Sequence, residues 1–89
     1  MKKFELGRLL ITRGALTAIE LLEIDGLELL GRHQGGDWSE MDEADIEANK
    51  QAVEVGTRIF SSYTVKGLKI WIITEADRST TTILLPDEY

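Results

Sequence analysis

The sequence predicts an α+β fold of two layers, with two or three N-terminal helices packed on a three- or four-stranded antiparallel sheet. Two observations lead to this fold class. Apolar residues recur at helical spacing through the first part of the chain, and their period changes to two after Gly56. Three β-branched and aromatic segments then follow with short breaks between them, which is typical of a C-terminal β-meander. The 89 residues are enough for a single domain, residues 1–89, and too few for two.

Local signals divide the N-terminal part into a strand and two helices. Residues 4–11 have the composition of a strand. Thr12 can cap a helix over residues 13–23, whose apolar residues form one stripe. Asp25 resembles the first residue of a capping box and begins a second helix. That helix should end near the glycine pair 35–36, because glycine readily takes the left-handed conformation that ends helices.

A third helix is expected over residues 41–55, with Ser39 or Asp42 as its cap and Gly56 as its end. Carboxylates crowd its first turn, where they complement the positive N-terminal end of a helix. Small or flexible apolar residues share one face of this helix and predict a close approach to the rest of the fold: Met41, Ala44, Ala48, Ala52 and Val55.

The meander consists of three predicted strands, over residues 58–65, 68–75 and 80–85. Lys66-Gly67 is a hairpin break between the first two. Pro86 ends the third, because proline cannot donate to a strand ladder. The N-terminal strand would be the fourth, at an edge of the sheet. In the middle strand, Leu68, Ile70 and Ile72 face one way, and Lys69, Trp71 and Ile73 face the other.

The net charge of −6 is concentrated in one segment, residues 37–54. The remainder of the chain holds equal numbers of acidic and basic side chains. An acidic protein lacks the electrostatic footprint of non-specific nucleic-acid binding, so none is expected. Within the segment, Lys50 is the only basic residue, against Asp37, Glu40, Asp42, Glu43, Asp45, Glu47 and Glu54.

The composition excludes several classes of site. There are no cysteines, so disulfides, thiolate zinc sites and cysteine nucleophiles are ruled out. A domain this small has little core to spare for a group such as FAD or haem, and we expect no cofactor. Charged residues break the N-terminal apolar stretch, which does not fit a signal peptide, and no run is long enough to span a membrane. We therefore expect a cytoplasmic protein without a membrane partner.

Two motifs resemble a family of short bacterial proteins that is often found on plasmids and other mobile elements. The first is Arg32-His33-x-x-Gly36-Asp37-Trp38, and the second runs from Ile72 to Tyr89 as IITEADRSxTTILLPxEY. The similarity extends over nearly the whole chain. Members of the family are labelled plasmid-related or hypothetical proteins, and the family carries no established activity to transfer. The resemblance implies a bacterial cytoplasmic protein.

The acidic segment admits three interpretations. The commonest for such a charge run is a solvated helix face. The second is a docking surface for a basic protein partner, with the binding residues Asp37, Trp38, Asp42, Asp45 and Glu47. The third is a mimic of the phosphate array of a nucleic acid, which would inhibit a DNA- or RNA-binding protein. Trp38 is expected to plug the core, with an exposed interface anchor as the alternative.

His33 is the only histidine and the first candidate for chemistry. Its position near the end of the second helix favours a cation that bonds the carbonyls of the last turn. His33, Asp37, Asp42 and Asp45 together offer one nitrogen and several oxygens. Their spacing matches no metal motif, and we expect no metal.

The alternative function is a small metal-independent ribonuclease or toxin-like hydrolase built on His33, Arg58 and Arg78. A histidine or glutamate moves the proton of the 2′-hydroxyl, arginine stabilises the charge on phosphorus, and tyrosine positions the phosphate. Tyr63 and Glu75 would complete such a site. This hypothesis requires the side chains to converge on one phosphate-sized site. The competing interpretation is structural, with Arg58 in a salt bridge to Glu75 across a hairpin.

The leading hypothesis is a non-enzymatic interaction or accessory protein of bacterial mobile DNA that uses the acidic segment 37–54. A small protein with a long apolar sheet edge often protects it by pairing, so a homodimer is a second expectation. Trp71 suggests that the solvent-side face of the sheet is used for self-association.

Overall fold

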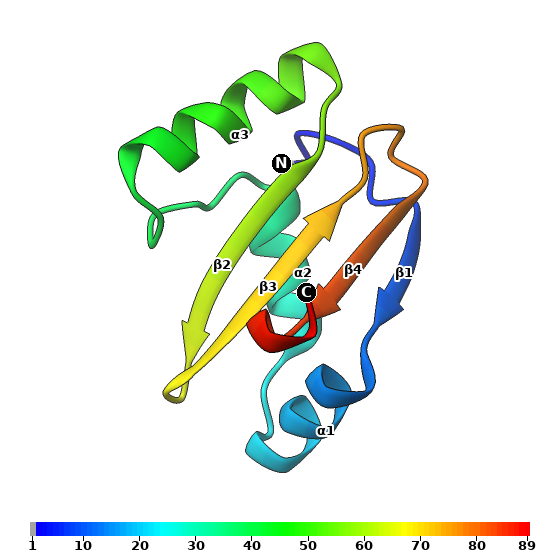
Figure 1. Cartoon of the computed structure of the whole chain (residues 1–89), viewed down its shortest axis with the longest axis vertical. Helices are drawn as coiled ribbons and strands as arrows, with labels where there is room; N and C mark the ends of the chain where they lie inside the picture. The colour runs from blue at the N-terminus through cyan, green and yellow to red at the C-terminus, as the bar shows by residue number, and fades with distance from the viewer. Residues whose placement is uncertain (1) are drawn as a thin grey trace.

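The computed structural model describes residues 2–89 as three helices, four strands and a short 3₁₀-helix (Figure 1). The sheet has the strand order β1-β4-β3-β2. The predicted α+β class is confirmed. In chain order the elements are β1 (Arg8–Ile11), α1 (Arg13–Leu22), α2 (Gly26–Gln34), α3 (Glu43–Val55), β2 (Ile59–Val65), β3 (Leu68–Thr74), β4 (Thr80–Leu84) and η1 (Pro86–Glu88).

The sheet is mixed, so the expectation of a wholly antiparallel sheet was wrong. The meander β2-β3-β4 is antiparallel as predicted, whereas β1 pairs parallel to β4, with Arg8 opposite Thr80 and Ile11 opposite Ile83. Strands that are joined by a tight turn must run antiparallel, but β1 is separated from β4 by most of the chain. No local turn therefore determines the direction of β1.

The predicted helix caps are present. The side-chain oxygens of Thr12, Asp25 and Asp42 each accept a hydrogen bond from a backbone N–H of the helix that follows. Asp42, rather than Ser39, caps α3. Gly56 ends α3 at φ 79°, a left-handed conformation that glycine adopts without steric cost.

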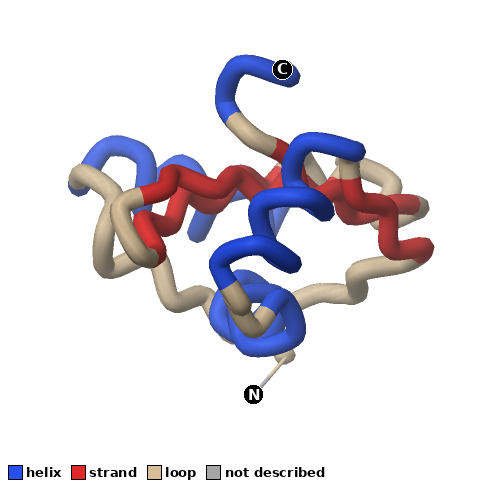
Figure 2. Tube along the Cα trace, turned by 90° about the horizontal axis from the view of Figure 1, so that it is seen from below, coloured by secondary structure: helices blue, strands red, loops and turns tan. Residues whose placement is uncertain are grey.

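Helix α2 lies across one face of the sheet, α3 lies along its β2 edge, and η1 folds against the other face (Figures 1 and 2). The main core forms where α1 and α2 meet the inward side chains of the strands. The last residue, Tyr89, packs on the outer face against Trp71, which also contacts Phe60. The buried members of the main core are Ala15, Ile24, Leu29, Leu30, Tyr63, Ile70, Ile72 and Ile83.

The buried face of α3 differs from the predicted one. Asn49 and Ala52 are buried, whereas Ala44, Ala48 and Val55 are exposed. A polar contact explains the difference. The Asn49 side chain bonds the backbone of Phe60 in β2, and this contact turns the Asn49 face of the helix toward the sheet. An apolar pattern cannot reveal such a contact.

None of the helices in residues 2–89 combines the length and apolar character that a membrane crossing requires.

Candidate functional site

His33 lies in the last turn of α2, and its imidazole is fully buried under the sheet. Its Nδ1 atom is 2.5 Å from Ser61 Oγ on β2, and its Nε2 atom is 2.8 Å from Thr74 Oγ1 on β3. The bonds continue from Thr74 to Thr81 on β4, with 2.7 Å between the hydroxyl oxygens. The histidine is thus the centre of a polar chain that crosses three adjacent strands.

At the Thr81 end of this series of hydrogen bonds, the contacts determine which group donates and which accepts. The Thr81 hydroxyl donates to the backbone carbonyl of Leu6 at 2.7 Å, so its oxygen must accept from Thr74. The Thr74 hydroxyl proton is then used, and its oxygen accepts the Nε2–H of His33. The imidazole therefore carries a proton on Nε2.

The contacts at the Ser61 end of the series are consistent with this direction. The indole Nε1 of Trp38 can only donate, and it donates to Ser61 Oγ at 2.9 Å. The Ser61 hydroxyl is then free to donate to His33 Nδ1. The buried polar side chains among residues 2–89 have hydrogen-bond partners throughout. Such complete satisfaction is what allows a polar chain to lie in a core.

Burial lowers the pKa of His33 to about 4, because desolvation penalises the charged form. The expected bonds from the imidazole to the carbonyls of the last helical turn are not formed, because both ring nitrogens contact side-chain hydroxyls of the sheet. The side chain turns into the core and bonds hydroxyl groups. Both ring nitrogens are used and neither is exposed to solvent, so His33 has no open position for a substrate proton.

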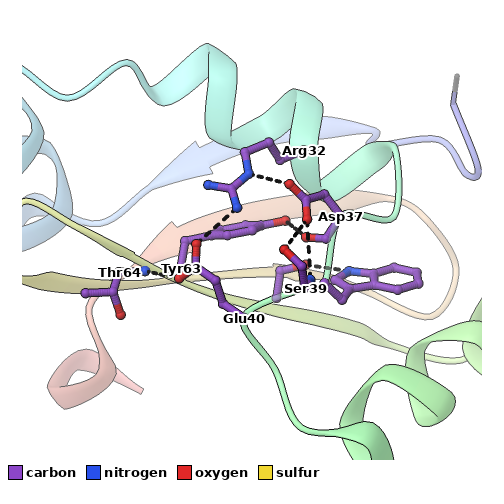
Figure 3. Close-up of polar contacts among 8 residues, drawn as sticks. Arg32, Asp37, Ser39, Glu40, Tyr63 and Thr64 are labelled. Atoms are coloured by element: carbon purple, nitrogen blue, oxygen red, sulfur yellow. Dashed lines mark hydrogen bonds and ion pairs between the residues drawn. The ribbon is translucent and has the colours of Figure 1, made fainter.

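A second polar cluster surrounds Arg32, the neighbour of His33 on α2 (Figure 3). The Arg32 Nε atom donates to Asp37 Oδ2 at 2.7 Å, and Nη2 donates to Glu40 Oε2 at 3.0 Å. The guanidinium carbon lies 4.4 Å from the centroid of the Tyr63 ring. The Arg32 hydrogen bond holds the pKa of Asp37 below its ordinary value, with a further contribution from Ser39. This cluster fastens the loop after α2 to the sheet.

Tyr63 belongs to the same cluster, with the Arg32 guanidinium lying over its ring. Its hydroxyl donates to the backbone carbonyl of Asp37 at 2.8 Å, and burial raises its pKa to about 12. A phenol with this pKa remains protonated at neutral pH. Tyr63 therefore holds the loop in place and is unsuited to act as a base.

The remaining candidates for catalysis lie elsewhere. Arg58 pairs with Glu75 at 3.2 Å, as the structural interpretation predicted, and also donates to the Tyr89 hydroxyl on the outer face of the sheet. The imidazole of His33 is on the opposite, helix-covered face.

Arg78, in the turn before β4, donates to the backbone carbonyls of Ala52 and Thr57 at the end of α3. The sheet therefore separates Arg58 from His33, and the arrangement that the ribonuclease hypothesis requires is not formed.

The acidic segment divides into two parts with different environments. Asp37 and Glu40 are paired with Arg32, and Asp42 caps α3. Asp45 and Glu47 are exposed on α3 and form no ion pair within residues 2–89. Of the predicted binding residues, these two are the ones whose carboxylates face solvent without a partner.

An apolar cleft of about 550 Å³ lies between α3 and the loop over residues 36–39. Trp38, Ile46 and Val53 form its apolar lining. The charged residues that line it are two lysines and two acids, namely Lys3, Lys50, Asp37 and Glu54. Trp38 is only 4 % exposed, which confirms it as a core plug, and it is also one of the residues that line the cleft. The cleft adjoins the exposed acidic side of α3.

Several residues of these clusters were missed as site residues in the sequence. Arg32, Asn49, Ser61, Thr74 and Thr81 have their roles through contacts with distant segments. One signal was available: Ser61, Thr74 and Thr81 occupy inward positions of three adjacent strands, where apolar residues are usual. Polar residues at inward positions require a buried partner, and the lone histidine is that partner.

Within residues 2–89, no three histidine or carboxylate side chains gather closely enough to hold a metal ion. Comparison with protein-family models, with curated proteins and with solved structures gives no match to this chain.

Proposed function

We propose that this protein is a non-enzymatic interaction domain that binds a basic segment of a protein partner along α3. The observation that carries the proposal is the unpaired acidic surface of this helix beside an apolar cleft. Glu43, Glu47 and Glu54 share one side of the helix, and Asp45 lies on the other side of its first turn. All four are exposed, and none forms an ion pair within residues 2–89. Lys50, the only basic residue of the helix, lies on the same side as the three glutamates and also lines the cleft.

The two features suit one kind of partner. Unpaired surface carboxylates attract lysine and arginine side chains and speed their approach, but exposed ion pairs contribute little affinity by themselves. Affinity usually comes from an apolar anchor that fills a pocket. The cleft walled by Trp38, Ile46 and Val53 can take such an anchor. The expected partner segment therefore combines one large apolar side chain with flanking lysines or arginines.

The buried state of His33 supports a non-enzymatic role, because its imidazole is closed to solvent. The resemblance to plasmid-related bacterial proteins suggests where the partner would be found. We infer an accessory protein of mobile DNA, with its partner encoded by the same element or by the bacterial host.

Affinity capture from a bacterial lysate, followed by titration of the captured protein, tests the proposal. Reversing Glu43, Glu47 and Glu54 to lysine should weaken binding at least about tenfold, since each lost attraction adds to a new repulsion. Filling the cleft with Val53→Trp should weaken binding without changing the charge. Raising the salt concentration should weaken binding to the unaltered protein, because salt screens exposed charges.

A matched control reverses three other exposed carboxylates that lie away from α3, namely Glu5, Glu20 and Asp87. It changes the net charge equally and should leave binding intact. Equal loss in both triple variants would indicate a general charge effect and contradict the proposed surface. Binding that survives both the α3 reversal and Val53→Trp would do the same.

A further inference from the structure

The two edges of the sheet differ in how their outward-pointing backbone groups are paired. At the β2 edge, the Asn49 amide bonds both the N–H and the C=O of Phe60, at 3.1 Å and 2.6 Å. The Glu40 carboxylate accepts the N–H of Thr64 at 2.8 Å. Side chains thus occupy both outward groups of Phe60 and the N–H of Thr64, to which another strand would bind. Proteins block an edge in this way to prevent unwanted pairing.

The β1 edge has no such cover (Figure 1). The N–H of Arg8 donates to the carbonyl of Ser79, just before β4, at 2.9 Å, and the N–H of Thr12 donates to that of Ile83 in β4 at 3.0 Å. Because backbone direction alternates along a strand, the N–H and C=O groups of Leu9 and Ile11 point away from β4. No hydrogen bond to these outward groups is formed within residues 2–89. An open ladder of this kind is complementary to another strand.

The side chains at this edge are apolar and exposed. Leu9, Leu10 and Ile11 are 52 %, 42 % and 39 % exposed, and Arg8 is the only charged residue of β1. An apolar groove of about 330 Å³ runs beside them, with Ile19 and Leu27 on its helical side. Of the nine exposed large hydrophobic residues within residues 2–89, seven lie within residues 9–27. The exposed apolar surface is thus concentrated around β1, α1 and the start of α2.

We propose that β1 pairs antiparallel with β1 of a second copy of this chain, across a two-fold axis at Leu10. In this register Leu9 of one copy lies opposite Ile11 of the other. Every outward N–H and C=O of these two residues then gains a partner in both copies. The two four-stranded sheets become one continuous sheet.

Self-complementarity favours a second copy over a different strand. A two-fold interface brings the same patch together from both sides. Here apolar residues meet on each face of the sheet, with Leu9 against Ile11 on the helix side and Leu10 against Leu10 on the other. Arg8 falls opposite Thr12, so no like charges meet. Any other partner would need to supply the same alternation.

The size of the patch predicts a weak dimer. A standard interface buries roughly 800 Å² per partner, about one seventh of the 5466 Å² surface of this chain. The four residues of β1 supply only part of that area, and the groove and Leu27 must supply the rest. We expect dissociation in the micromolar range.

This interface replaces the outer sheet face that Trp71 suggested. Trp71 is half-buried between Phe60 and Tyr89, so it is already packed within the chain.

Sedimentation equilibrium over micromolar to millimolar concentrations tests the proposal. The unaltered chain should change from monomer to dimer. Leu10→Lys places two ammonium groups together at the two-fold axis and should weaken the dimer at least about tenfold. Val55→Lys is the matched control: it makes the same kind of change at an exposed residue of α3, near the opposite edge, and should leave the dimer intact. A monomer at every concentration overturns the proposal.

Amide hydrogen exchange gives a second readout that is independent of mass. In the dimer, the amides of Leu9 and Ile11 should be protected, and dilution or Leu10→Lys should expose them. The amide of residue 10 points toward β4 and should stay protected in the variant, which shows that β1 itself remains folded. A dimer that leaves Leu9 and Ile11 unprotected would use another surface and would also overturn the proposal. Neither result depends on the acidic surface of α3.

Discussion

At the scale of single residues, His33 has the role of a structural centre. Neutral imidazole both donates and accepts, so it can link a serine on one strand to a threonine on the next. Its neighbour Arg32 makes a separate set of bonds to the loop after α2. Trp38 lies in that loop and joins the two sets, because its indole N–H donates to Ser61 Oγ on β2. The first sequence motif therefore consists largely of residues that bind one another or share a partner.

The lowered pKa of His33 predicts a specific pH dependence of stability. The unfolded chain takes up a proton near the ordinary pKa of 6.5, whereas the folded chain resists until about 4. Stability is therefore fully present above 6.5 and is lost as the pH falls toward 4. The free energy of unfolding should fall by about 2–3 kcal/mol between about pH 7.5 and about pH 4.5. Urea unfolding at the two pH values measures this difference.

His33→Gln is the control for that measurement. Glutamine also donates and accepts but does not titrate, so the variant should lose most of the slope between pH 6.5 and 4 whatever its overall stability. The carboxylate of Asp37, whose pKa is lowered, affects stability at lower pH. An unchanged slope in His33→Gln would show that another group is responsible.

At the scale of elements, α3 is attached to the sheet edge through a side-chain amide as well as through apolar packing. Asn49 bonds both backbone groups of Phe60, and Arg78 bonds the carbonyls at the end of the helix. Ala52 and the half-buried Ile46 and Val53 supply the apolar contact. Asn49 and these apolar residues hold the inner side of α3 against the sheet. The acidic residues of the helix are therefore left on its outer side.

Asn49→Ala should lower the free energy of unfolding by about 2 kcal/mol, since two hydrogen bonds are lost and Phe60 keeps unpaired backbone groups. Asn49→Asp should also destabilise, because a carboxylate can accept from the N–H of Phe60 but repels its C=O. Gln51→Ala, at an exposed position of the same helix, is the matched control and should have little effect. Urea unfolding gives the values, and faster exchange of the Phe60 amide in both Asn49 variants would locate the change. Equal stability of Asn49→Ala and Gln51→Ala would refute the anchoring role.

At the scale of the whole molecule, the C-terminal residues connect segments that are far apart in the sequence. The Glu88 carboxylate accepts from the Thr12 hydroxyl and from the backbone N–H of Gly14, which joins η1 to the start of α1. Tyr89 covers Trp71 and accepts a hydrogen bond from Arg58. Residues of the second motif thus connect the outer face of the sheet to the N-terminal half.

Tyr89→Ala should uncover Trp71, while Trp38 stays in the core. Quenching of tryptophan fluorescence by acrylamide should rise, because a half-buried indole loses its cover on one side. Tyr89→Phe keeps the ring and should leave quenching near the level of the unaltered protein. The same quenching in the alanine and phenylalanine variants would show that the Tyr89 ring does not shield Trp71.

The sequence by itself determined the parts of this protein that depend on neighbouring residues. The caps at Thr12, Asp25 and Asp42, the helix end at Gly56 and the antiparallel meander were all predictable. In each of these, the interacting groups lie close together in the chain, so spacing and residue type were sufficient.

The tertiary structure alone decided the parallel direction of β1, the buried face of α3 and the neutral state of His33. Each depends on groups that are far apart in the chain and meet only in the folded state. The tertiary structure also divided the acidic segment, since Arg32 neutralises its first part and leaves the carboxylates of α3 free. The composition located the negative charge in residues 37–54. Only the ion pairs show which of these carboxylates are available to a partner.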